Sequence, residues 1–402
     1  MSPIRTLLLC TRLPFPPLGG DRLRVFQLAR ALASLGPVEL IAPREAGDDL
    51  GEARRGLPFV SRLRCPPAHR FSQLGPLLRG AVQGSPLQQA LYDHPGLRAE
   101  VLDALPTVDL VVCHLLRPLP WLPATSPPLL ICLQDALAAQ AEEAMSAPGW
   151  TGGWRRLALA VERSRLPSAE ADAVARADGL SFITARDRDA VLADRLDGPP
   201  SVVTVAAVDR IALRPQEPTP DRIVFAGNLR TASNQDMAVH LATRLFPMIR
   251  SARPEAHLHL VGIDAPPAIR RLGGRPGVHF VGPVQDMAAT LAQAAVTICP
   301  LRFGSGVQNK VLESLAAGTP CVVTERVALA LHPDAVLGGA VAVGRSDRSL
   351  VVRVVEILSN PSLRQRAGEA GIRFVAAHHD PHAAFAPLLE LATKLARPVR
   401  AP

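Results

Sequence analysis

Lysines, aromatic rings and long apolar segments are scarce in this sequence. Aromatic residues make up 4% of its 402 residues, which disfavours a protein that binds single-stranded nucleic acid by stacking bases on aromatic rings. The longest uncharged run, residues 118–134, contains five prolines and cannot form a membrane-spanning helix. The apolar run after Arg5 is about one strand long, too short for a signal peptide. We therefore expect a cytoplasmic protein that at most rests on the inner face of the cell membrane.

The cysteines do not form a C-x-x-C pair. Five of the six lie in or beside apolar runs of the kind that form buried strands. We expect small buried thiols rather than disulfides or a zinc site, in keeping with a reducing compartment. The residues are Cys10, Cys65, Cys113, Cys132, Cys299 and Cys321.

Basic residues outnumber acidic ones, 44 to 36, which gives a net charge of +8. Only Lys310 and Lys394 are lysines, so the excess is carried by arginine. This sign of charge suits a nucleotide phosphate, an anionic lipid headgroup or a nucleic acid. No helical pattern carries a basic stripe of the kind that reads DNA, so we expect no nucleic-acid partner.

Strand-like apolar runs alternate with helical patterns along the chain, which indicates an α/β protein with parallel, doubly wound sheets. A proline-rich segment, Arg210–Arg222, separates two such series. The pattern predicts two Rossmann-like domains that face each other across a cleft, with ligands at the carboxyl ends of the strands. We place the first domain at residues 1–208 and the second at 209–379, with the final helix, 380–402, packed back on the first domain.

The strongest local signal is the stretch 298–324, where a strand, a glycine loop and a helix follow one another. Gly304 and Gly306 let backbone amides approach a ligand, and a helix N-terminus offers unpaired amides to a phosphate. Lys310 lies one turn into the helix, and Glu313 lies one turn further on the same face. A lysine could hold a diphosphate, and a carboxylate could accept both hydroxyls of a ribose. An ordinary strand–turn–helix with a surface Lys–Glu pair is the alternative.

These residues resemble the GT-B glycosyltransferases of family 4, which transfer a sugar from a nucleotide-sugar donor with retention. In that family an E-x7-E pattern followed by A-x-G-x-P-V-V binds the donor, and here the sequence reads Glu313-Ser-Leu-Ala-Ala-Gly-Thr-Pro320-Cys-Val-Val. The first acidic position of the pattern falls on Ser305. The G-x-Q-N-K-x-L-E form looks closest to exopolysaccharide-associated sugar transferases. The resemblance implies donor contacts from Ser305, Gly306, Val307, Lys310 and Glu313.

Two further segments of the second half resemble family loops at the donor. Residues 225–229 resemble the F-x-G-R-L turn, with Asn228 in place of the arginine. The usual lysine falls near Ser233, and Arg230 could compensate for it. Residues 278–286 resemble the F-x-G-x-V-x-D segment, whose backbone contacts the base. The resemblance therefore adds Gly227, Asn228, Arg230 and Gly282 to the donor site.

The first half resembles the family in its first glycine loop, which faces the donor phosphates and the acceptor in relatives. Gly19 and Gly20 open a helix there. Asp21 is a candidate N-cap of that helix. Arg24, about one turn in, could reach an anion, and a solvated arginine is the alternative.

His114 ends an apolar strand, at the edge where such sheets hold their ligands. In retaining relatives a histidine at this place contacts the sugar at the reacting centre, whereas a packed or exposed histidine is the alternative. Asp135 follows Gln134, where relatives carry His-Asp. We expect Asp135 either to position the acceptor hydroxyl or to cap the next helix. A charged helix further on is interpreted as a solvated face: Glu162, Arg165 and Glu170.

Sugar transfer requires that the charge of the leaving diphosphate is neutralised. The sequence shows no aspartate triplet of metal-ligand type near the site, so Lys310 and the helix N-terminus would neutralise it. We expect no metal and no cofactor other than the donor substrate. The resemblance implies that His114 shields the reacting sugar and that the leaving phosphate acts as the base in a front-face attack. The catalytic candidates are His114, Asp135 and Lys310.

Residues 53–92 contain six arginines and no acidic residue. Such a surface could rest on anionic lipid, at about 1 kcal/mol per arginine near the membrane, which would suit a lipid-linked or polysaccharide acceptor. Irregular solvated surface is the alternative. The arginines are Arg54, Arg55, Arg62, Arg64, Arg70 and Arg79.

Three functions are compatible with the sequence. The first is a glycosyltransferase that builds exopolysaccharide or another cell-surface glycan. The second is a non-catalytic GT-B scaffold or nucleotide-binding protein. A sugar-nucleotide 2-epimerase ranks last, because the expected arrangement of histidine and acidic residues is not visible. The second function, a non-catalytic scaffold or nucleotide-binding protein, is motivated by four departures from the family pattern: Gln134, Asn228, Ser233 and Ser305.

Overall fold

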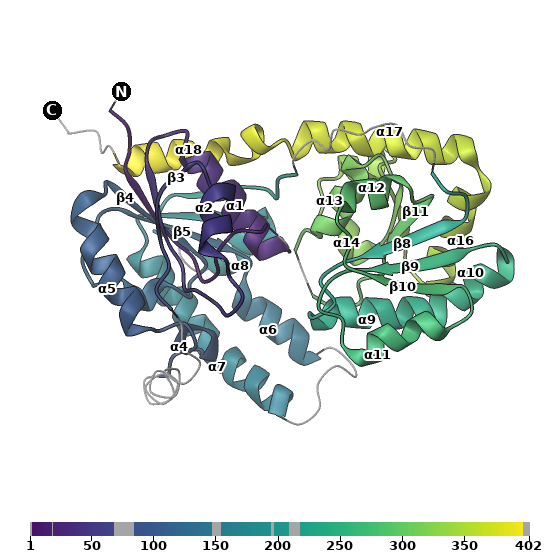
Figure 1. Cartoon of the computed structure of the whole chain (residues 1–402), viewed down its shortest axis with the longest axis horizontal. Helices are drawn as coiled ribbons and strands as arrows, with labels where there is room; N and C mark the ends of the chain where they lie inside the picture. The colour runs from purple at the N-terminus through teal and green to yellow at the C-terminus, as the bar shows by residue number, and fades with distance from the viewer. Residues whose placement is uncertain are drawn as a thin grey trace. The chain divides into compact units, whose positions relative to one another are not determined.

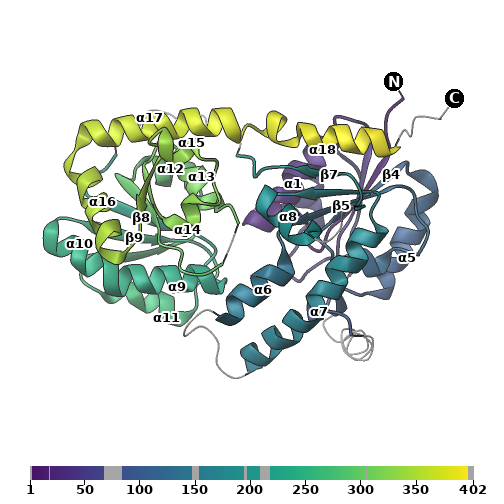
Figure 2. The same ribbon diagram turned by 180° about the vertical axis from the view of Figure 1, so that it is seen from behind.

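The computed structural model describes residues 2–17, 19–67, 84–146, 154–193, 197–208, 218–304 and 306–396. The chain divides into two compact units, the first formed by Met1–Ala207 with His382–Pro402 and the second by Val208–Pro381. Each unit is a parallel β-sheet with helices on its two faces (Figures 1 and 2). The α/β class predicted from the alternation of strands and helices is therefore confirmed.

The sheet of the first unit has the order β3-β2-β1-β4-β5-β6-β7, and all neighbouring strands are parallel. The strand order reverses between β1 and β4, which is the topological switch point where Rossmann-like sheets bind ligands. The strands are β1 (Thr6–Leu9), β2 (Val38–Ile41), β3 (Val60–Arg64), β4 (Leu110–His114), β5 (Leu129–Gln134), β6 (Gly179–Phe182) and β7 (Ser201–Val203).

The central strands of this sheet are apolar on both faces, because helices cover both. Leu7 and Leu9 of β1 belong to one buried cluster, and Leu8 belongs to the cluster on the opposite face. Phe385 and Leu388 of the final helix pack into the second cluster. The helices of the first unit are α1 (Gly20–Leu32), α2 (Leu50–Gly56), α4 (Leu87–Ala90), α5 (Pro95–Ala104), η2 (Leu105–Thr107), η3 (Leu119–Trp121), α6 (Leu137–Ser146), α7 (Trp154–Arg176), α8 (Ala185–Leu192) and α18 (Pro381–Ala396).

The second unit repeats this topology with the strand order β10-β9-β8-β11-β12-β13, again all parallel. Its switch point lies between β8 and β11. The strands are β8 (Arg222–Ala226), β9 (His257–Val261), β10 (Val278–Gly282), β11 (Val296–Cys299), β12 (Cys321–Thr324) and β13 (Val341–Gly344). The helices are α9 (Ala232–His240), η4 (Leu241–Leu245), α10 (Phe246–Ala252), α11 (Pro267–Arg270), η5 (Arg271–Gly274), α12 (Met287–Ala292), α13 (Asn309–Ala316), α14 (Glu325–Ala328), α15 (Asp334–Leu337), α16 (Asp347–Ser359) and α17 (Pro361–His378).

One strand was not expected from the sequence. β3 forms the edge of the first sheet and pairs only with β2 among the described strands. Only Val60 and Leu63 of its five residues are apolar, and it carries two arginines, which oppose pairing of an edge strand with another chain. The continuous apolar run that marks the central strands is therefore missing at this edge.

The thiols follow the expectation from the sequence. All six cysteines are free, and five of them are buried, whereas Cys65 is half-buried. Burial raises the pKa of these thiols, for example that of Cys132 to about 12. None of the helices in the described part of the chain combines the length and the apolar character needed to cross a membrane.

Candidate active site

Lys310 is the centre of the candidate site in the second unit. It lies in the first turn of α13, its ammonium group donates a hydrogen bond to Asn234 Oδ1, and its Nζ lies 5.0 Å from the centroid of the Phe225 ring. Asn234, in the first turn of α9, donates from Nδ2 to the backbone oxygen of Asn228 at 2.8 Å. Asn228 follows β8 and Lys310 follows β11, so these contacts join the two sides of the switch point. The sequence did not single out Asn234 as the residue that connects them.

The two ionisable side chains of α13 are half-buried, in contrast to a surface pair. Burial lowers the pKa of Lys310, and Cys299 and Glu313 oppose this effect. Burial also raises the pKa of Glu313, and Lys310 opposes that shift. A positive group that is partly removed from water binds an anion more strongly than a solvated one does.

Three glycines bring the backbones after neighbouring strands together at the same edge of the sheet. Gly262 donates from its amide to the oxygen of Gly282 at 2.8 Å, and the amide of Gly227 donates to Val261. A Cβ at Gly262 would lie 1.8 Å from the oxygen of Gly227, so no other residue fits there. Gly282 itself has a φ of 78°, which favours glycine. The arrangement leaves backbone atoms rather than side chains at the ends of β8, β9 and β10.

The loop before α13 also depends on glycine. Gly304 and Gly306 have φ angles of 95° and 81°. The helix begins after Gln308, whose side chain does not cap the first-turn amides. Val307, between these residues, is half-buried. Ser305, which the resemblance placed at the donor, lies outside the described residues.

Arg230 lies in the turn after β8. Its backbone amide donates to Asn228 Oδ1 at 2.9 Å, and its side chain is exposed. The Asn228 side chain therefore shapes this turn, and its carbonyl holds Asn234.

His114 lies at the carboxyl end of β4 and is buried, with 1% of its surface exposed. Its Nε2 contacts the amide nitrogen of Gln134, and its Nδ1 lies 3.8 Å from Asp21 Oδ1 with no hydrogen-bond partner among the described residues. Burial lowers the pKa of His114 to about 4. Because Gln134 donates to Nε2, the neutral ring carries its proton on Nδ1. Leu115 and Gln134 both have a φ of 66°, and non-glycine residues in this region are often found at functional sites.

The glycine loop of the first unit places Asp21 beside this histidine. Gly19, with a φ of 87°, is the N-cap of α1, and Gly20 is its first residue. The expectation that Asp21 caps the helix is therefore wrong, because Asp21 lies inside the first turn. Since α1 follows β1 and His114 ends β4, Asp21 and His114 stand on the two sides of the first switch point.

Arg24 has a role that the sequence did not indicate. Its guanidinium donates to the backbone oxygens of Thr204 at 2.6 Å and Val205 at 2.9 Å, and it lies 4.6 Å from the centroid of the Phe385 ring. Burial lowers its pKa to about 10. Arg24 is neither solvated nor directed to a ligand here, because its charge is engaged by carbonyls inside the first unit.

Asp135 follows Gln134 at the end of β5. Burial, followed by the negative charge of Asp187, raises the pKa of Asp135 to about 6. Other carboxylates bind the amides at the start of α6: Asp187 accepts from Ala136 at 3.2 Å, and Glu170 accepts from Ala138 at 3.0 Å. Asp135 itself makes a hydrogen bond with the side chain of Gln140, within the first turn of α6.

The helix interpreted as a solvated charged face is packed instead. Glu170 of α7 is buried beneath α6, as described above. Glu162 accepts hydrogen bonds from the amide and the side chain of Gln88 at 3.0 and 3.2 Å, and Arg165 donates to the oxygen of Ser85 at 2.9 Å. The sequence prediction failed because charges on a long helix look alike whether they face water or the ends of other elements.

The arginine-rich segment 53–92 is only partly available to a membrane. Arg64 is buried, and its guanidinium binds Glu39, Glu100 and Asp103. The expectation that Arg64 could contact lipid is therefore wrong. Three others lie at described positions with exposed side chains: Arg54, Arg55 and Arg62. Arg70 and Arg79 lie outside the described residues.

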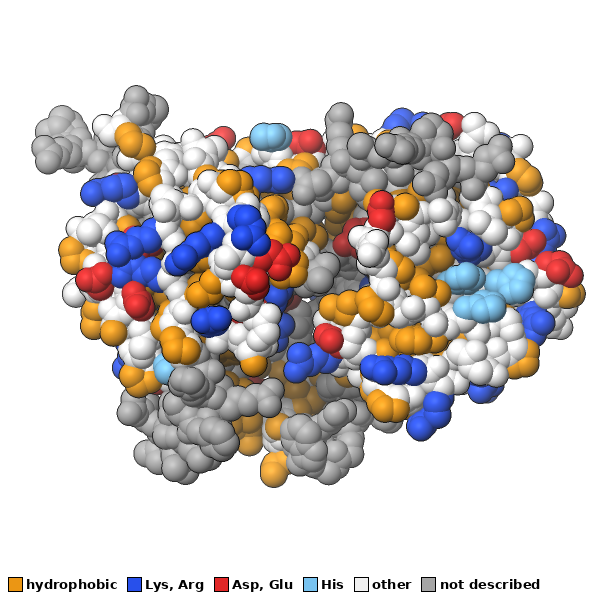
Figure 3. Space-filling model, viewed as in Figure 1, with side chains coloured by type: hydrophobic (Ala, Val, Ile, Leu, Met, Phe, Trp, Pro, Cys, Tyr) orange, Lys and Arg blue, Asp and Glu red, His pale blue; other side chains and the backbone are white. Residues whose placement is uncertain are grey.

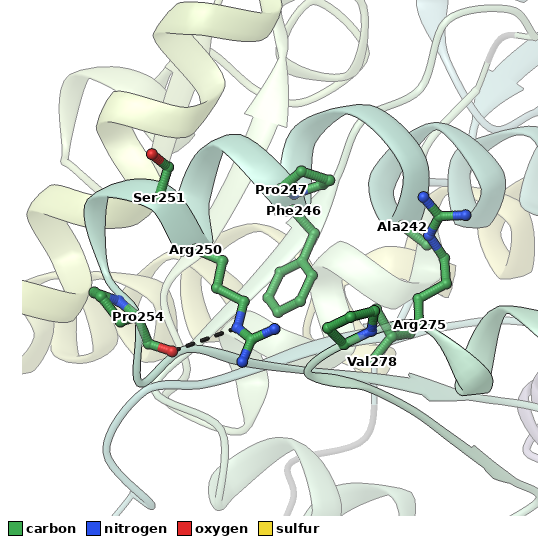
Figure 4. Close-up of a pocket in the computed structure, with 9 residues that line it drawn as sticks. Ala242, Phe246, Pro247, Arg250, Ser251, Pro254, Arg275 and Val278 are labelled. Carbon is green, nitrogen blue, oxygen red and sulfur yellow. Dashed lines mark hydrogen bonds between the residues drawn. The ribbon is translucent and has the colours of Figure 1, made fainter.

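Two cavities of the second unit differ in their place on the sheet. A cavity of about 400 Å³ is lined by Phe246, Arg250, Arg275 and Val278 (Figure 4). It lies at the amino end of β10, opposite to the edge where such sheets bind ligands. A polar cavity of about 250 Å³ lies at the carboxyl edge instead, next to β11, β12 and β13. Its arginines have protein partners: Arg302 with Asp236, Arg326 with the oxygen of Gly304, and Arg345 with Glu325.

Part of the second unit is similar to a known protein family. Residues 220–360 match the protein family described as glycosyl transferases group 1. No curated protein sequence matches the chain. The matched region is about a third of the chain and contains the Lys310 site.

Solved structures resemble the chain over almost its whole length. Sucrose-phosphate synthase from Thermosynechococcus elongatus has a TM-score of 0.66 at 16% identity and covers 98% of this chain and 99% of its own. HepE from Anabaena, solved with UDP and glucose, has a TM-score of 0.65 at 14% identity and covers 97% and 99%. TarM from S. aureus, solved with fondaparinux, α-GlcNAc-glycerol and UDP, has a TM-score of 0.67 at 8% identity and covers 96% and 99%. The chain therefore has the GT-B fold of two Rossmann-like domains, and the family match supports a glycosyltransferase.

Proposed function

We propose that this chain is a retaining glycosyltransferase that moves a sugar from a nucleotide-sugar donor to a glycan or lipid-linked acceptor. The observation that carries the proposal is the half-buried ammonium group of Lys310, held by Asn234 across the switch point of the second unit. The family match over residues 220–360 includes every residue of this group. HepE, solved with UDP and glucose, and TarM, solved with UDP, support a uridine nucleotide as the first donor to test.

In this proposal the second unit holds the nucleotide. The Lys310 ammonium and the N-terminal amides of α13 bind the diphosphate and stabilise the negative charge that develops on it as the sugar leaves. Glu313, one turn further along α13, accepts hydrogen bonds from the ribose hydroxyls. The base is proposed to lie next to Gly282, where a Cβ would meet only the Phe280 ring within 4 Å. These positive groups belong to the chain itself, so we propose that transfer needs no metal ion.

The first unit supplies the groups for the sugar and the acceptor. The neutral ring of His114 donates from Nδ1, which has no partner among the described residues, to the sugar at the reacting centre. A neutral imidazole adds no positive charge next to a sugar centre that becomes cationic, which favours its use there. Asp135, whose pKa is raised to about 6, orients the acceptor hydroxyl. The leaving phosphate takes the proton of that hydroxyl, so no enzyme nucleophile is required.

The product is proposed to be an exopolysaccharide or another cell-surface glycan made on the cytoplasmic side of the membrane. The exposed arginines Arg54, Arg55 and Arg62 are the candidate contacts to anionic lipid. A lipid-linked or polymeric acceptor would be presented at that surface.

A non-catalytic GT-B scaffold or nucleotide-binding protein is the second candidate. Asn234 already occupies the ammonium group of Lys310, and Gln134 occupies Nε2 of His114. Both contacts must be released or shared before a substrate binds, which costs affinity for the substrate. Asn228 and Gln134 also replace residues that carry charge in the family.

The test is a thermal-shift panel of UDP-, GDP-, ADP- and dTDP-sugars on three proteins. Wild type is compared with Lys310→Ala and with Lys394→Ala, which removes the other lysine at an exposed position of α18. We expect one nucleotide class to raise the melting temperature of wild type and Lys394→Ala but not of Lys310→Ala. No shift with any nucleotide would contradict donor binding.

Hydrolysis of the bound donor separates the enzyme from the scaffold. Slow release of free sugar by wild type, lost in His114→Ala while nucleotide binding is kept, is the result expected of a transferase. Binding without any hydrolysis or transfer would favour the scaffold.

A further inference from the structure

Two imidazoles and one carboxylate meet in the second unit, outside the candidate active site. His378 Nε2 lies 2.9 Å from Asp334 Oδ2, and His332 Nδ1 lies 3.4 Å from the same oxygen. The two imidazole rings are stacked with 4.1 Å between their centroids. One ligand atom from each of the three side chains lies within 4.8 Å of the other two.

The fold brings these residues together from two segments. Asp334 is the first residue of α15, His332 precedes it by two positions, and His378 is the last residue of α17. α15 lies beside α17 (Figure 2). Ala335 is fully buried and anchors α15, and the last turn of α17 is anchored by Phe374, whose ring centroid lies 5.1 Å from that of His378. The backbone that carries the three side chains is therefore fixed by packing.

We infer that His332, Asp334 and His378 bind a divalent transition-metal ion of the zinc type. Zinc takes nitrogen and carboxylate oxygen ligands at about 2.0–2.2 Å in a tetrahedron, which sets its ligand atoms about 3.3 Å apart. The separations of 2.9 and 3.4 Å from Asp334 Oδ2 lie on either side of that value. Three protein ligands leave the fourth position to water.

The protonation of the rings is compatible with this role. The backbone amide of Asp334 donates to His332 Nδ1 at 3.3 Å, so this nitrogen carries no proton, and its lone pair exchanges the amide for the metal on binding. The hydrogen bond between His378 and the Asp334 carboxylate is replaced when the metal binds, and the Nε2 proton is released. Side-chain exposures of 51% for His332, 56% for Asp334 and 25% for His378 allow an ion to enter from solvent.

The ligand set also selects the class of ion. Imidazole suits zinc, copper, iron and nickel, whereas magnesium and calcium prefer sites built from oxygen. A bound ion would join α15 to the end of α17, next to Pro381, where the chain leaves the second unit.

Another group of histidines provides a matched control. His257 and His259 of β9 and His279 of β10 gather on the face of the second unit that Figure 3 shows in pale blue. His279 Nε2 lies 3.3 Å from His257 Nδ1, and the rings of His259 and His279 are 5.0 Å apart. Among the described residues, the ligand atoms of these three imidazoles do not meet as closely as those of His332, Asp334 and His378. It is the site at which adventitious binding to surface histidines would occur.

The experiment titrates the metal-free full chain with Zn²⁺ by calorimetry and with Co²⁺ by visible absorption. Four proteins are compared: wild type, His332→Asn, His378→Gln, and the double variant His257→Gln/His279→Gln. We expect one tight site in wild type and in the double variant, with the absorption bands of tetrahedral cobalt. His332→Asn and His378→Gln are expected to weaken that site by at least about tenfold. Mg²⁺ at the same concentration should neither bind nor displace cobalt.

Several results would overturn the inference. These are no tight site in wild type, unchanged affinity in both single variants, or loss of the site in the double variant. A thiolate-to-cobalt charge-transfer band would show that cysteines hold the ion instead. Melting curves without metal establish that each variant is folded, and the exposure of His332 makes its replacement by asparagine the safer variant.

Discussion

Asn234 accepts a hydrogen bond from the ammonium group of Lys310, although the two residues lie 76 positions apart in the sequence. The same carboxamide donates to the oxygen of Asn228. One side chain thus fixes the half-buried cation and the turn after β8 together.

Asn234→Ala is expected to destabilise the second unit. The variant leaves a half-buried ammonium group without its amide acceptor, and the loss of a hydrogen bond to a charged group costs about 1.5–3 kcal/mol. Urea unfolding followed by circular dichroism measures the change. Asn234→Asp keeps an acceptor for Lys310 and should lose less. Equal stability of Asn234→Ala and wild type would show that water or another group replaces the contact.

His114 is expected to make the stability of the first unit fall in weak acid. The folded-state pKa of about 4 lies below the ordinary value of 6.5. Below about pH 6.5 the unfolded chain therefore binds a proton at His114 that the folded chain does not bind, and this continues until about pH 4. The difference between these two pKa values corresponds to about 3 kcal/mol of unfolding free energy. Relative to wild type, His114→Gln should gain up to this amount of unfolding free energy between pH 7 and pH 4.

Asp135→Asn is the control, because Asp135 is expected to change the unfolding free energy with pH in the opposite direction to His114. Burial raises the pKa of Asp135 to about 6, so the folded protein binds a proton below this pH that the unfolded chain binds only near pH 4. Asp135 therefore favours folding as the pH falls, and its replacement should lower the unfolding free energy relative to wild type over the same range. Parallel pH profiles for all three proteins would contradict both assignments.

Gly262→Ala is expected to disturb the edge of the second sheet. Its Cβ would meet the oxygen of Gly227 at 1.8 Å, so the backbone after β8 or β9 must move. Overpacking of this kind costs about 1–3 kcal/mol. Gly274→Ala is the matched control, because a Cβ there meets nothing within 4 Å, and it should stay within about 0.5 kcal/mol of wild type. Chemical unfolding of the two variants compares them, and equal effects would refute the close contact.

Arg54→Ala/Arg55→Ala is expected to weaken binding to anionic vesicles. Both side chains are exposed in the last turn of α2, and about 1 kcal/mol per arginine predicts a loss of about 30-fold. Cosedimentation with phosphatidylglycerol vesicles measures the affinity, with phosphatidylcholine vesicles as the neutral surface. Arg186→Ala/Arg188→Ala on α8 removes the same charge elsewhere and should matter less. Equal losses in both double variants would point to net charge rather than to a defined surface.

The position of several candidate site residues at a sheet edge could be predicted because their signal is local. Lys310 and Glu313 stand out through the glycine loop and the helix that follows it. His114 stands out because an apolar strand ends there. In each case the neighbouring residues in the sequence determine the element, and the element determines the edge of the sheet at which the side chain lies.

Other residues could not be predicted because their partners are distant in the sequence. Arg24 pairs with carbonyls 180 and 181 positions away, and Glu170 with the start of α6. The charges of Arg24 and Glu170 suggested that these side chains face solvent or a ligand. Packing against other elements buries both side chains instead. Propensity and periodicity do not encode which helix end will face a given carboxylate.

The sequence by itself determined the alternation of strands and helices, the division into two series and the free thiols, because the period of apolar residues follows from burial on each element. Only the tertiary structure decided which polar groups meet: Asn234 with Lys310, Asp21 with His114, and His332 and Asp334 with His378. The physical reason is that strand order and helix packing bring distant positions side by side, and this depends on the whole fold rather than on any single segment.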